Sequence, residues 1–313
     1  MSITVAAPPD TRAFSGFRSA AGLGRSILRT GEGRVGGAIL VIAVITAAFP
    51  DLLTGPYQTA ALATGGFLQH PSPHHLLGTD EVGRDVLNLV VHGARVSLAI
   101  GTLATTIAVL LGTLIGLVAG YAGGWLDSWL MRLTDFFFVV PPFVLALAIT
   151  PIALEAVGQS GEILGFRASL FMIVLVIGLT SWPFITRVVR SQTLSLRNRP
   201  FVDRARVAGT GPIAIMARHI LPNVIPQIVA NGALVIAGAI ATETALAFIG
   251  LGDPLQPSWG TLLFLAQRAG AASAGAWWYV GSPGICVVVV ILAFVLIGEA
   301  LDNALNPRRR VIP

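Results

Sequence analysis

The chain has 313 residues, of which 54% are hydrophobic and only 11% are charged, and its mean hydropathy is +0.79. A soluble globular domain carries about 25% charged residues, so this composition excludes an ordinary soluble domain and predicts an integral membrane protein. All twenty basic residues are arginine, which excludes an ATP-hydrolysing phosphate-binding loop in this chain, because that loop needs a lysine on the terminal phosphates.

Six segments are apolar over the roughly 20 residues that a helix needs to cross a bilayer. They are residues 34–54, 96–120, 132–153, 168–190, 224–250 and 280–301. The first segment starts well inside the chain and has no small-residue cleavage site after a short apolar core, which favours a retained anchor over a signal peptide. Pro141 and Pro142 in the third segment and Pro183 in the fourth are expected to kink their helices.

Arginines are distributed unevenly among the segments that connect these spans. The two terminal tails and the second and fourth connections hold sixteen, whereas the other three connections hold four. The fourth connection alone holds seven, namely Arg187, Arg190, Arg197, Arg199, Arg204, Arg206 and Arg218. Because cytoplasmic segments carry the excess of basic residues, both termini and the loop of residues 187–223 are predicted to face the cytoplasm. This bias accounts for the net charge of +5 without a nucleic-acid partner.

Residues 55–95 form the first extracytoplasmic connection in this topology. Apolar residues recur there at helical spacing from Val82 to Val96, and Thr79 or Asp80 is suited to cap such a helix. An amphipathic helix that leads into the second span is therefore expected. The alternative is a surface connection with no role beyond packing.

The fourth connection contains two short helical patterns, which Gly209, Gly211 and Pro212 separate. Ile213 and Met216 place apolar side chains in this otherwise charged loop. Exposed apolar groups suggest a docking surface for a soluble partner. The alternative is an amphipathic helix on the bilayer surface, attracted by its arginines to anionic lipid. The residues alone leave both interpretations open.

This connection resembles the EAA loop of ABC importer permeases, in which an E-A-A triplet, a later glycine and a final leucine-proline frame the coupling helix. Residues 203–205 stand at the triplet, Gly209 at the glycine and residues 221–222 at the leucine-proline. The chain departs from the pattern with aspartate for glutamate, with Arg204 for the first alanine and with His219 for an isoleucine. The resemblance implies that separate ATPase subunits dock on this loop. The implied coupling residues are Asp203, Ala205, Gly209, Thr210, Gly211, Pro212, Ile213, Met216, Leu221 and Pro222.

Other segments continue the resemblance in family order over residues 70–307. Residues 77–85 are similar to the L-G-T-D-x-x-G-R-D signature of the dipeptide, oligopeptide and nickel permease subfamily. The motif residues that match are Gly78, Thr79, Asp80, Gly83, Arg84 and Asp85. Residues 93–98, 121–127 and 218–223 also follow the subfamily, and so do Glu243, residues 246–252 and residues 257–260. The whole pattern resembles the "C" permease of the subfamily more than its "B" partner.

The fold that the resemblance implies is an all-α, six-helix bundle of the type I ABC importer permeases, with a cytoplasmic coupling helix. The implied division is a cytoplasmic tail (1–33), a first transmembrane helix (34–54), an extracytoplasmic loop with an amphipathic helix (55–95), a five-helix core (96–303) that includes the coupling loop (191–223), and a cytoplasmic C-terminal tail (304–313).

The implied function is that of a permease subunit in a bacterial inner membrane, which forms the path for di- or oligopeptides or a related small solute. The implied partners are a second homologous permease in a heterodimer, two ATPase subunits that carry ATP and Mg, membrane lipid, and a binding protein docked near residues 55–95 and 252–280. No catalytic, cofactor-binding or metal-binding residue is expected in this chain. ATP binding would close the ATPase dimer, push the element of residues 209–216 and rock the bundle.

Glu243 is the one acid deep inside a span. Such a carboxylate is costly and faces the bundle interior or a water-filled path. It could line the path and meet the amino terminus of a peptide, or it could be a buried group that Thr242, Thr244 or another helix satisfies; the structural role is favoured. Asp127 and Arg132 are interpreted as residues that orient helices at the membrane edge.

Three other functions compete with a peptide permease. Nickel or another small solute stays open, because the binding protein is expected to select the solute. A secondary transporter or channel would need more ionisable groups inside the spans than Glu243. An intramembrane enzyme is disfavoured, because there is no G-x-S-x-G, zinc motif or paired intramembrane acid and base. His70, His74 and His75 lack a further ligand at a diagnostic spacing.

Overall fold

The computed structural model describes residues 24, 28–157, 162–163 and 166–305, and this part of the chain is mostly helical. The elements are α2 (Gly31–Ala48), α3 (Pro50–Thr54), η2 (Ala60–Leu62), α4 (Val86–Ala122), α5 (Gly124–Val139), α6 (Pro142–Val157), β1 (Glu162–Ile163), β2 (Phe166–Arg167), α7 (Ala168–Leu196), α8 (Pro200–Val207), α9 (Pro212–Ile215), η3 (Met216–Ile220), α10 (Leu221–Leu246), η4 (Ala247–Leu251), α11 (Trp259–Arg268) and α12 (Trp277–Leu305). The two short strands pair antiparallel, and η3 and η4 are π-helical.

Five helical stretches are long and apolar enough to cross a membrane: α2, α4, α7, the continuous run from α9 to η4, and α12. The third predicted span is present as a broken pair, because α5 and α6 meet at an angle of 85°. The predicted kink at Pro141 and Pro142 is thus confirmed and is sharp, since the ring of proline clashes with the preceding turn and removes an N–H donor. Pro183, in contrast, lies inside α7 without interrupting that helix.

The structure corrects where the helix that leads into the second span begins. All of residues 55–95 are described, and within them α4 begins only at Val86 and then runs unbroken to Ala122. Asp85, rather than Thr79 or Asp80, is its N-cap, and the Asp85 carboxylate accepts a hydrogen bond from the Leu87 N–H at 2.8 Å. Residues 86–95 are therefore the first turns of the long helix itself.

Helix α4 packs along α7 through a row of glycines spaced by four residues. A side-chain carbon at Gly112, Gly116 or Gly120 would lie within 2.8 Å of an atom of α7. Small residues at this spacing let two helices approach closely in a membrane. The two helices consequently form one closely packed unit.

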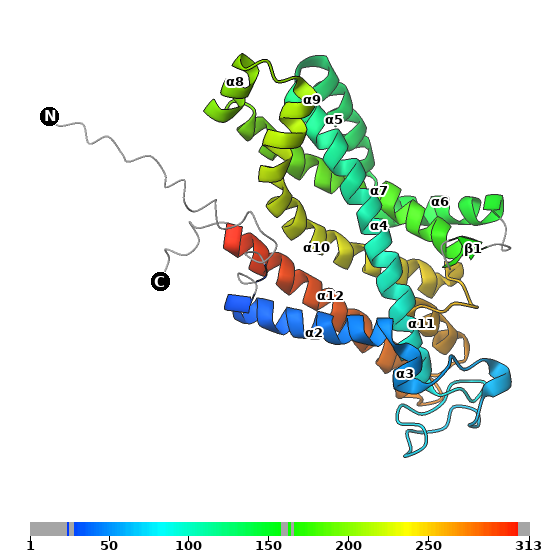
Figure 1. The fold of residues 1–313 in the computed structure, drawn as a ribbon. Coiled ribbons are helices and arrows are strands. Elements are labelled where there is room, and N and C mark those ends of the chain that lie inside the picture. The colour runs from blue at the N-terminus through cyan, green and yellow to red at the C-terminus, as the bar shows by residue number, and fades with distance from the viewer. Residues whose placement is uncertain (1–23, 25–27, 158–161, 164–165, 306–313) are drawn as a thin grey trace.

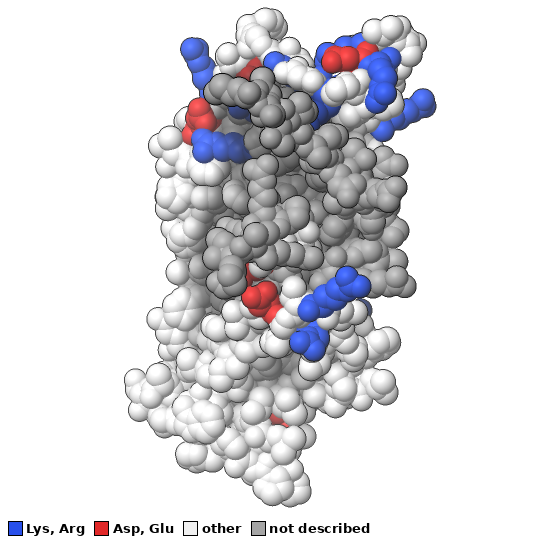
Figure 2. All heavy atoms as spheres, turned by 90° about the vertical axis from the view of Figure 1, so that its left-hand side faces the viewer, with Lys and Arg blue, Asp and Glu red and all other residues white. Residues whose placement is uncertain are grey.

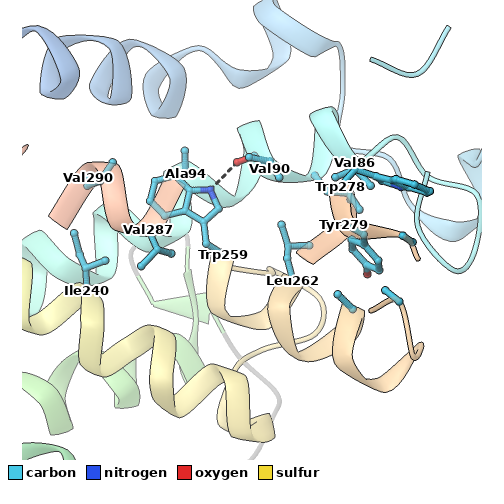
Figure 3. Close-up of a cluster of buried hydrophobic side chains, with 14 of the residues drawn as sticks. Val86, Val90, Ala94, Ile240, Trp259, Leu262, Trp278, Tyr279, Val287 and Val290 are labelled. Atoms are coloured by element: carbon cyan, nitrogen blue, oxygen red, sulfur yellow. Dashed lines mark hydrogen bonds between the residues drawn. The ribbon is translucent and has the colours of Figure 1, made fainter. Parts of the chain in front are cut away.

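The two ends of the bundle differ in structure and charge. Helices α8 and α9 lie at one end, while the long connection between α3 and α4 lies at the other (Figure 1). Arginine side chains gather over the end that carries α8 (Figure 2). Near the other end, Trp259 of α11 fills the space between α4 and α12, and its indole N–H donates to the carbonyl of Val90 at 2.9 Å (Figure 3).

Candidate functional site: the loop between α7 and α10

The loop that the sequence singled out is an ordered helix–turn–helix in the structure. Helix α8 starts with Pro200, where a missing N–H costs nothing, and it stops at a glycine. The Gly209 N–H donates to the carbonyl of Arg206 at 2.9 Å, and the Thr210 N–H donates to that of Ala205 at 3.0 Å. This pair of bonds, with Gly209 at φ +77°, is a Schellman motif, which satisfies the last carbonyls of the helix.

After this turn the chain continues into the membrane without a flexible linker. Helix α9 begins at Pro212 and passes directly into the π-helical segment η3 and then into α10. The wide turn lies just before Pro222, which has no N–H for the usual helical bond to Arg218. Because α9, η3 and α10 are continuous, a displacement of α9 is a displacement of the end of α10.

The loop has a buried face and an exposed tip. Val202, Ala205 and Ile215 are buried in an apolar cluster that includes Leu117 of α4 and Val189 of α7. At the tip, the side chain of Val207 is 90% exposed and that of Ile213 is 78% exposed. A buried base therefore presents two exposed apolar side chains, one on each side of the glycine turn.

The structure places the predicted coupling residues in two groups. The turn and its flanks bring together Asp203, Ala205, Gly209, Thr210, Gly211, Pro212 and Ile213. Met216, Leu221 and Pro222 lie further along, at the junction of η3 with α10. Ala205 is buried, whereas Asp203 is exposed and accepts a hydrogen bond from Arg206 at 3.1 Å. Sequence reasoning missed Val207; its signal was a β-branched apolar residue two positions before the glycine break.

The predicted motif in the first connection is a closely bonded loop. The carboxylate of Asp80 is fully buried and accepts hydrogen bonds from the Val82 N–H at 3.0 Å, from the Arg84 N–H at 2.8 Å and from the Arg84 guanidinium at 2.6 Å. Asp85 caps α4 and also contacts His75 at 3.2 Å. The motif thus fixes the entry of the chain into α4.

Its other three residues attach this loop to the rest of the molecule. The Thr79 hydroxyl donates to the carbonyl of Gly66 at 2.7 Å, and the Thr79 carbonyl accepts from the Trp278 indole of α12 at 3.2 Å. Gly78 and Gly83 both have positive φ, and a side chain at Gly78 would collide with Trp278. Through these contacts the motif joins the start of α4 to α12.

Glu243 lies inside α10 and is only 2% exposed. Its Oε2 has no hydrogen-bond partner among the described residues. The carboxylate neighbours Ser258, the residue that caps α11, and Thr244. The structure therefore places this acid in the interior of the subunit, against the start of α11.

A second buried acid, Asp253, was not singled out from the sequence. It follows η4 and is 4% exposed. Its Oδ2 accepts a hydrogen bond from the Arg167 guanidinium at 2.8 Å and another from the Ser169 hydroxyl. Asp253 thereby ties the segment after α10 to the start of α7, a pairing between residues 86 positions apart that no local pattern reveals.

Comparison with known proteins finds one family and a shared fold. The family model described as "binding-protein-dependent transport system inner membrane component" matches residues 112–311. The chain is 39% identical over 284 residues to the dipeptide transport system permease protein DppC of Escherichia coli K12, which covers 88% of this chain and 89% of that protein. It is 33% identical over 284 residues to the di/tripeptide transport system permease protein DppC of Pseudomonas aeruginosa, covering 88% of each chain.

Among solved structures, the chain is similar to a chain of the inward-facing MetNI methionine ABC transporter. The TM-score is 0.54 at 17% identity, over 70% of this chain and 96% of that chain. At this identity the likeness shows the fold alone. It confirms the helical bundle of a type I importer that the sequence predicted.

Proposed function

The chain belongs to the family of binding-protein-dependent transport system inner membrane components, and on this premise we propose that it forms the path for di- or oligopeptides in an ATP-driven importer. The names of its relatives support peptides as the solute. They describe dipeptide, di/tripeptide and peptide transport permeases, at 33–39% identity over most of the chain.

In the proposed complex this chain pairs with a second, homologous permease, two ATPase subunits and an extracytoplasmic binding protein. ATP and Mg²⁺ belong to the ATPase subunits, and this chain carries no catalytic residue and no cofactor. The absence of lysine supports this division, because a phosphate-binding loop requires one. The arginine distribution supports a cytoplasmic position for both termini and for the α8–α9 end.

The observation that carries the docking proposal is the exposed apolar tip of the loop. Val207 and Ile213 face solvent, although other apolar residues of the same two elements are buried. Burying both side chains against a soluble ATPase subunit would gain about 1.5–3 kcal/mol for each. Closure of the ATPase subunits would then push α9, and its continuity with α10 would carry the push into the bundle.

The test is to place aspartate at both tip positions. Val207→Asp combined with Ile213→Asp should cut co-purification of the ATPase subunits about tenfold or more, because each change removes apolar contact and buries a charge. Insertion into the membrane and pairing with the second permease should persist. Leu255→Asp is the matched control, since Leu255 is 64% exposed in the segment after η4 and should leave co-purification unchanged.

Two outcomes would contradict the proposal. Full retention of the ATPase by the double variant would reject this loop as the docking site. Uptake of peptide by the purified chain alone in liposomes, driven by an ion gradient without ATP, would reject the importer itself. Mass spectrometry of the ligand on the co-purified binding protein separates a peptide from a nickel complex or another small solute.

A further inference from the structure

The turn between α4 and α5, residues 120–127, is held by three arginines, one in α7 and two in the loop of residues 197–220 between α7 and α10, which we call the docking loop. Arg190 of α7 forms a two-pronged ion pair with Asp127, with N–O distances of 2.6 and 2.7 Å. Arg197, the C-cap of α7, donates to the carbonyl of Gly120 at 3.1 Å. The guanidinium of Arg206 in α8 lies 5.5 Å from the centre of the Tyr121 ring.

The backbone of this turn is built for that close contact. Gly123 has φ +66° and Gly124 has φ +59°, so two successive residues adopt a conformation that side chains disfavour. A side-chain carbon at Gly123 would also approach the Arg197 guanidinium to 2.9 Å. Glycine at this position allows α4 and α5 to be joined by a single residue while the arginine reaches the end of α4.

Helix α5 buries few side chains of its own, so these polar contacts are a large part of its attachment. Of its residues only Thr134 is buried, whereas α4 and α7 each bury many side chains. Leu133 and Phe137 are partly buried against the same apolar cluster that holds α8. The Arg190–Asp127 pair is 31% and 15% exposed, and its fork geometry fixes the orientation of both side chains.

A second ion pair between the same two helices provides an internal comparison. Arg187 and Asp135 meet through one contact of 2.7 Å, with 46% and 59% of their side chains exposed. Exposed single contacts of this kind contribute little. The start of α5 is therefore attached by the Arg190–Asp127 pair, whereas Arg197 and Arg206 contact the end of α4 just before the turn.

We propose that the α4–α5 turn is a second coupling element, through which motion of α8 reaches the broken α5–α6 pair. Asp127 and Arg190 are positioning residues in this scheme, and Tyr121 is the contact with α8. When the docking loop moves, Arg197 and Arg206 carry the turn with it, the Arg190–Asp127 pair keeps the start of α5 joined to α7, and α5 pivots at the break after Val140. This inference rests on the proposed function, because it assigns a second route by which closure of the ATPase subunits moves the bundle.

The test uses the whole complex in proteoliposomes, with its binding protein and with radiolabelled dialanine as the probe. Asp127→Asn should leave assembly and the ATP hydrolysis seen without binding protein unchanged. Dialanine uptake and the hydrolysis stimulated by the binding protein should both fall about tenfold, within the range for changes in a coupling network. Exchange of the pair, Asp127→Arg with Arg190→Asp, should restore much of the uptake.

Asp135→Asn is the matched control, because it is the same change on the same helix against the same partner helix. It should alter uptake by less than about twofold. Uptake by the Asp127→Asn complex within twofold of the unmodified complex would overturn the proposal. If that variant fails to assemble, Arg190→Lys is tested in its place, since lysine keeps the charge and loses the two-pronged geometry. Unchanged uptake by the Arg190→Lys complex would likewise overturn the proposal.

A distance measurement separates coupling from simple stability. In a Cys286→Ala background, spin labels at Arg199→Cys and Ser128→Cys report on the start of α8 and on α5, both of which are exposed sites. The distance should stay constant between nucleotide-free and ATP-trapped complexes, and it should change when Asp127→Asn is added. A change in the unmodified pair would mean that α8 moves without α5. Failure of the unmodified chain to bring down ATPase subunits would instead reject the proposed function.

Discussion

Gly209 and Gly211 lie two residues apart in the docking loop, yet their backbones differ. Gly209 has φ +77°, whereas Gly211 has an ordinary extended conformation at φ −67° and caps α9. A side-chain carbon at either position would have no neighbouring atom within 4 Å, so space does not distinguish the two sites. Any difference between alanine variants at the two sites must come from the backbone.

Gly209→Ala should therefore destabilise the loop by about 1–2 kcal/mol, because a side chain disfavours the left-handed conformation. Gly211→Ala should cost less, because its φ suits alanine, and only the preference of an N-cap for glycine over alanine opposes the change. Thermal unfolding of the purified complex and the ratio of uptake to ATP hydrolysis measure both effects. Equal behaviour of the two variants would show that the Schellman turn does not contribute to coupling.

Glu243 either lines the solute path or is a buried structural acid, and a single substitution distinguishes these two roles. Gln has nearly the same shape and removes the charge, so Glu243→Gln should keep or raise the thermal stability of the complex. If the role is structural, uptake should stay within about twofold of the unmodified complex, as for a change that does not affect the path. Glu299→Gln, on the exposed face of α12, is the control. A tenfold loss of uptake with normal assembly would assign Glu243 to the path.

At the residue scale, the sequence predicted Gly209 and Asp203 through a motif but missed Asp253, Val207 and the partners of Arg190. The motif works because a helix stop with a glycine is a local property of the backbone. Asp253 and Arg190 have partners 86 and 63 residues away, and only the fold brings such residues together.

At the scale of the elements, the close packing of α4 on α7 is a feature that the sequence alone does not predict. The G-x-x-x-G spacing of Gly112 and Gly116 is common by chance in an apolar chain, and only the structure shows the helix that faces it. The reverse holds for α5 and α6. Adjacent prolines act through their own ring and missing N–H, so Pro141 and Pro142 predict the break without any knowledge of the fold.

Gly116→Ala tests this packing directly. The new methyl group would lie 2.8 Å from the Thr186 carbonyl and from Val189, so α4 and α7 must separate. Overpacking of this kind costs about 1–3 kcal/mol, and the complex should melt several degrees lower. Gly238→Ala on α10 is the matched control, because nothing lies within 4 Å of that position and alanine favours a helix. A lower melting temperature in the control alone would contradict the packing argument.

At the scale of the whole molecule, hydropathy and arginine counts were enough to predict a helical membrane bundle, and the structure and its relatives confirm that architecture. They could not predict where α4 begins, because the first turns of a long helix and a separate amphipathic helix have the same apolar spacing. The cap decides between them: Asp85 caps α4, whereas the Asp80 carboxylate holds the turn of residues 82–84 before the helix.

The orientation of the bundle is the remaining prediction, and three cysteine variants test it together with the broken span. In a Cys286→Ala background, exposed positions lie before α2 (Leu28→Cys), in the first connection (Leu62→Cys) and at the end of α8 (Ala208→Cys). An impermeant maleimide added to right-side-out vesicles should label only the Leu62→Cys variant, because the arginine-rich segments face the cytoplasm.

Labelling of the other two variants only after permeabilisation also means that an even number of membrane crossings separates Leu28 from Ala208. That count requires the α5–α6 pair to cross the membrane as one span. If Ala208→Cys is labelled from outside and Leu28→Cys is not, the bent pair enters and leaves on the same side, and the docking loop cannot meet a cytoplasmic ATPase.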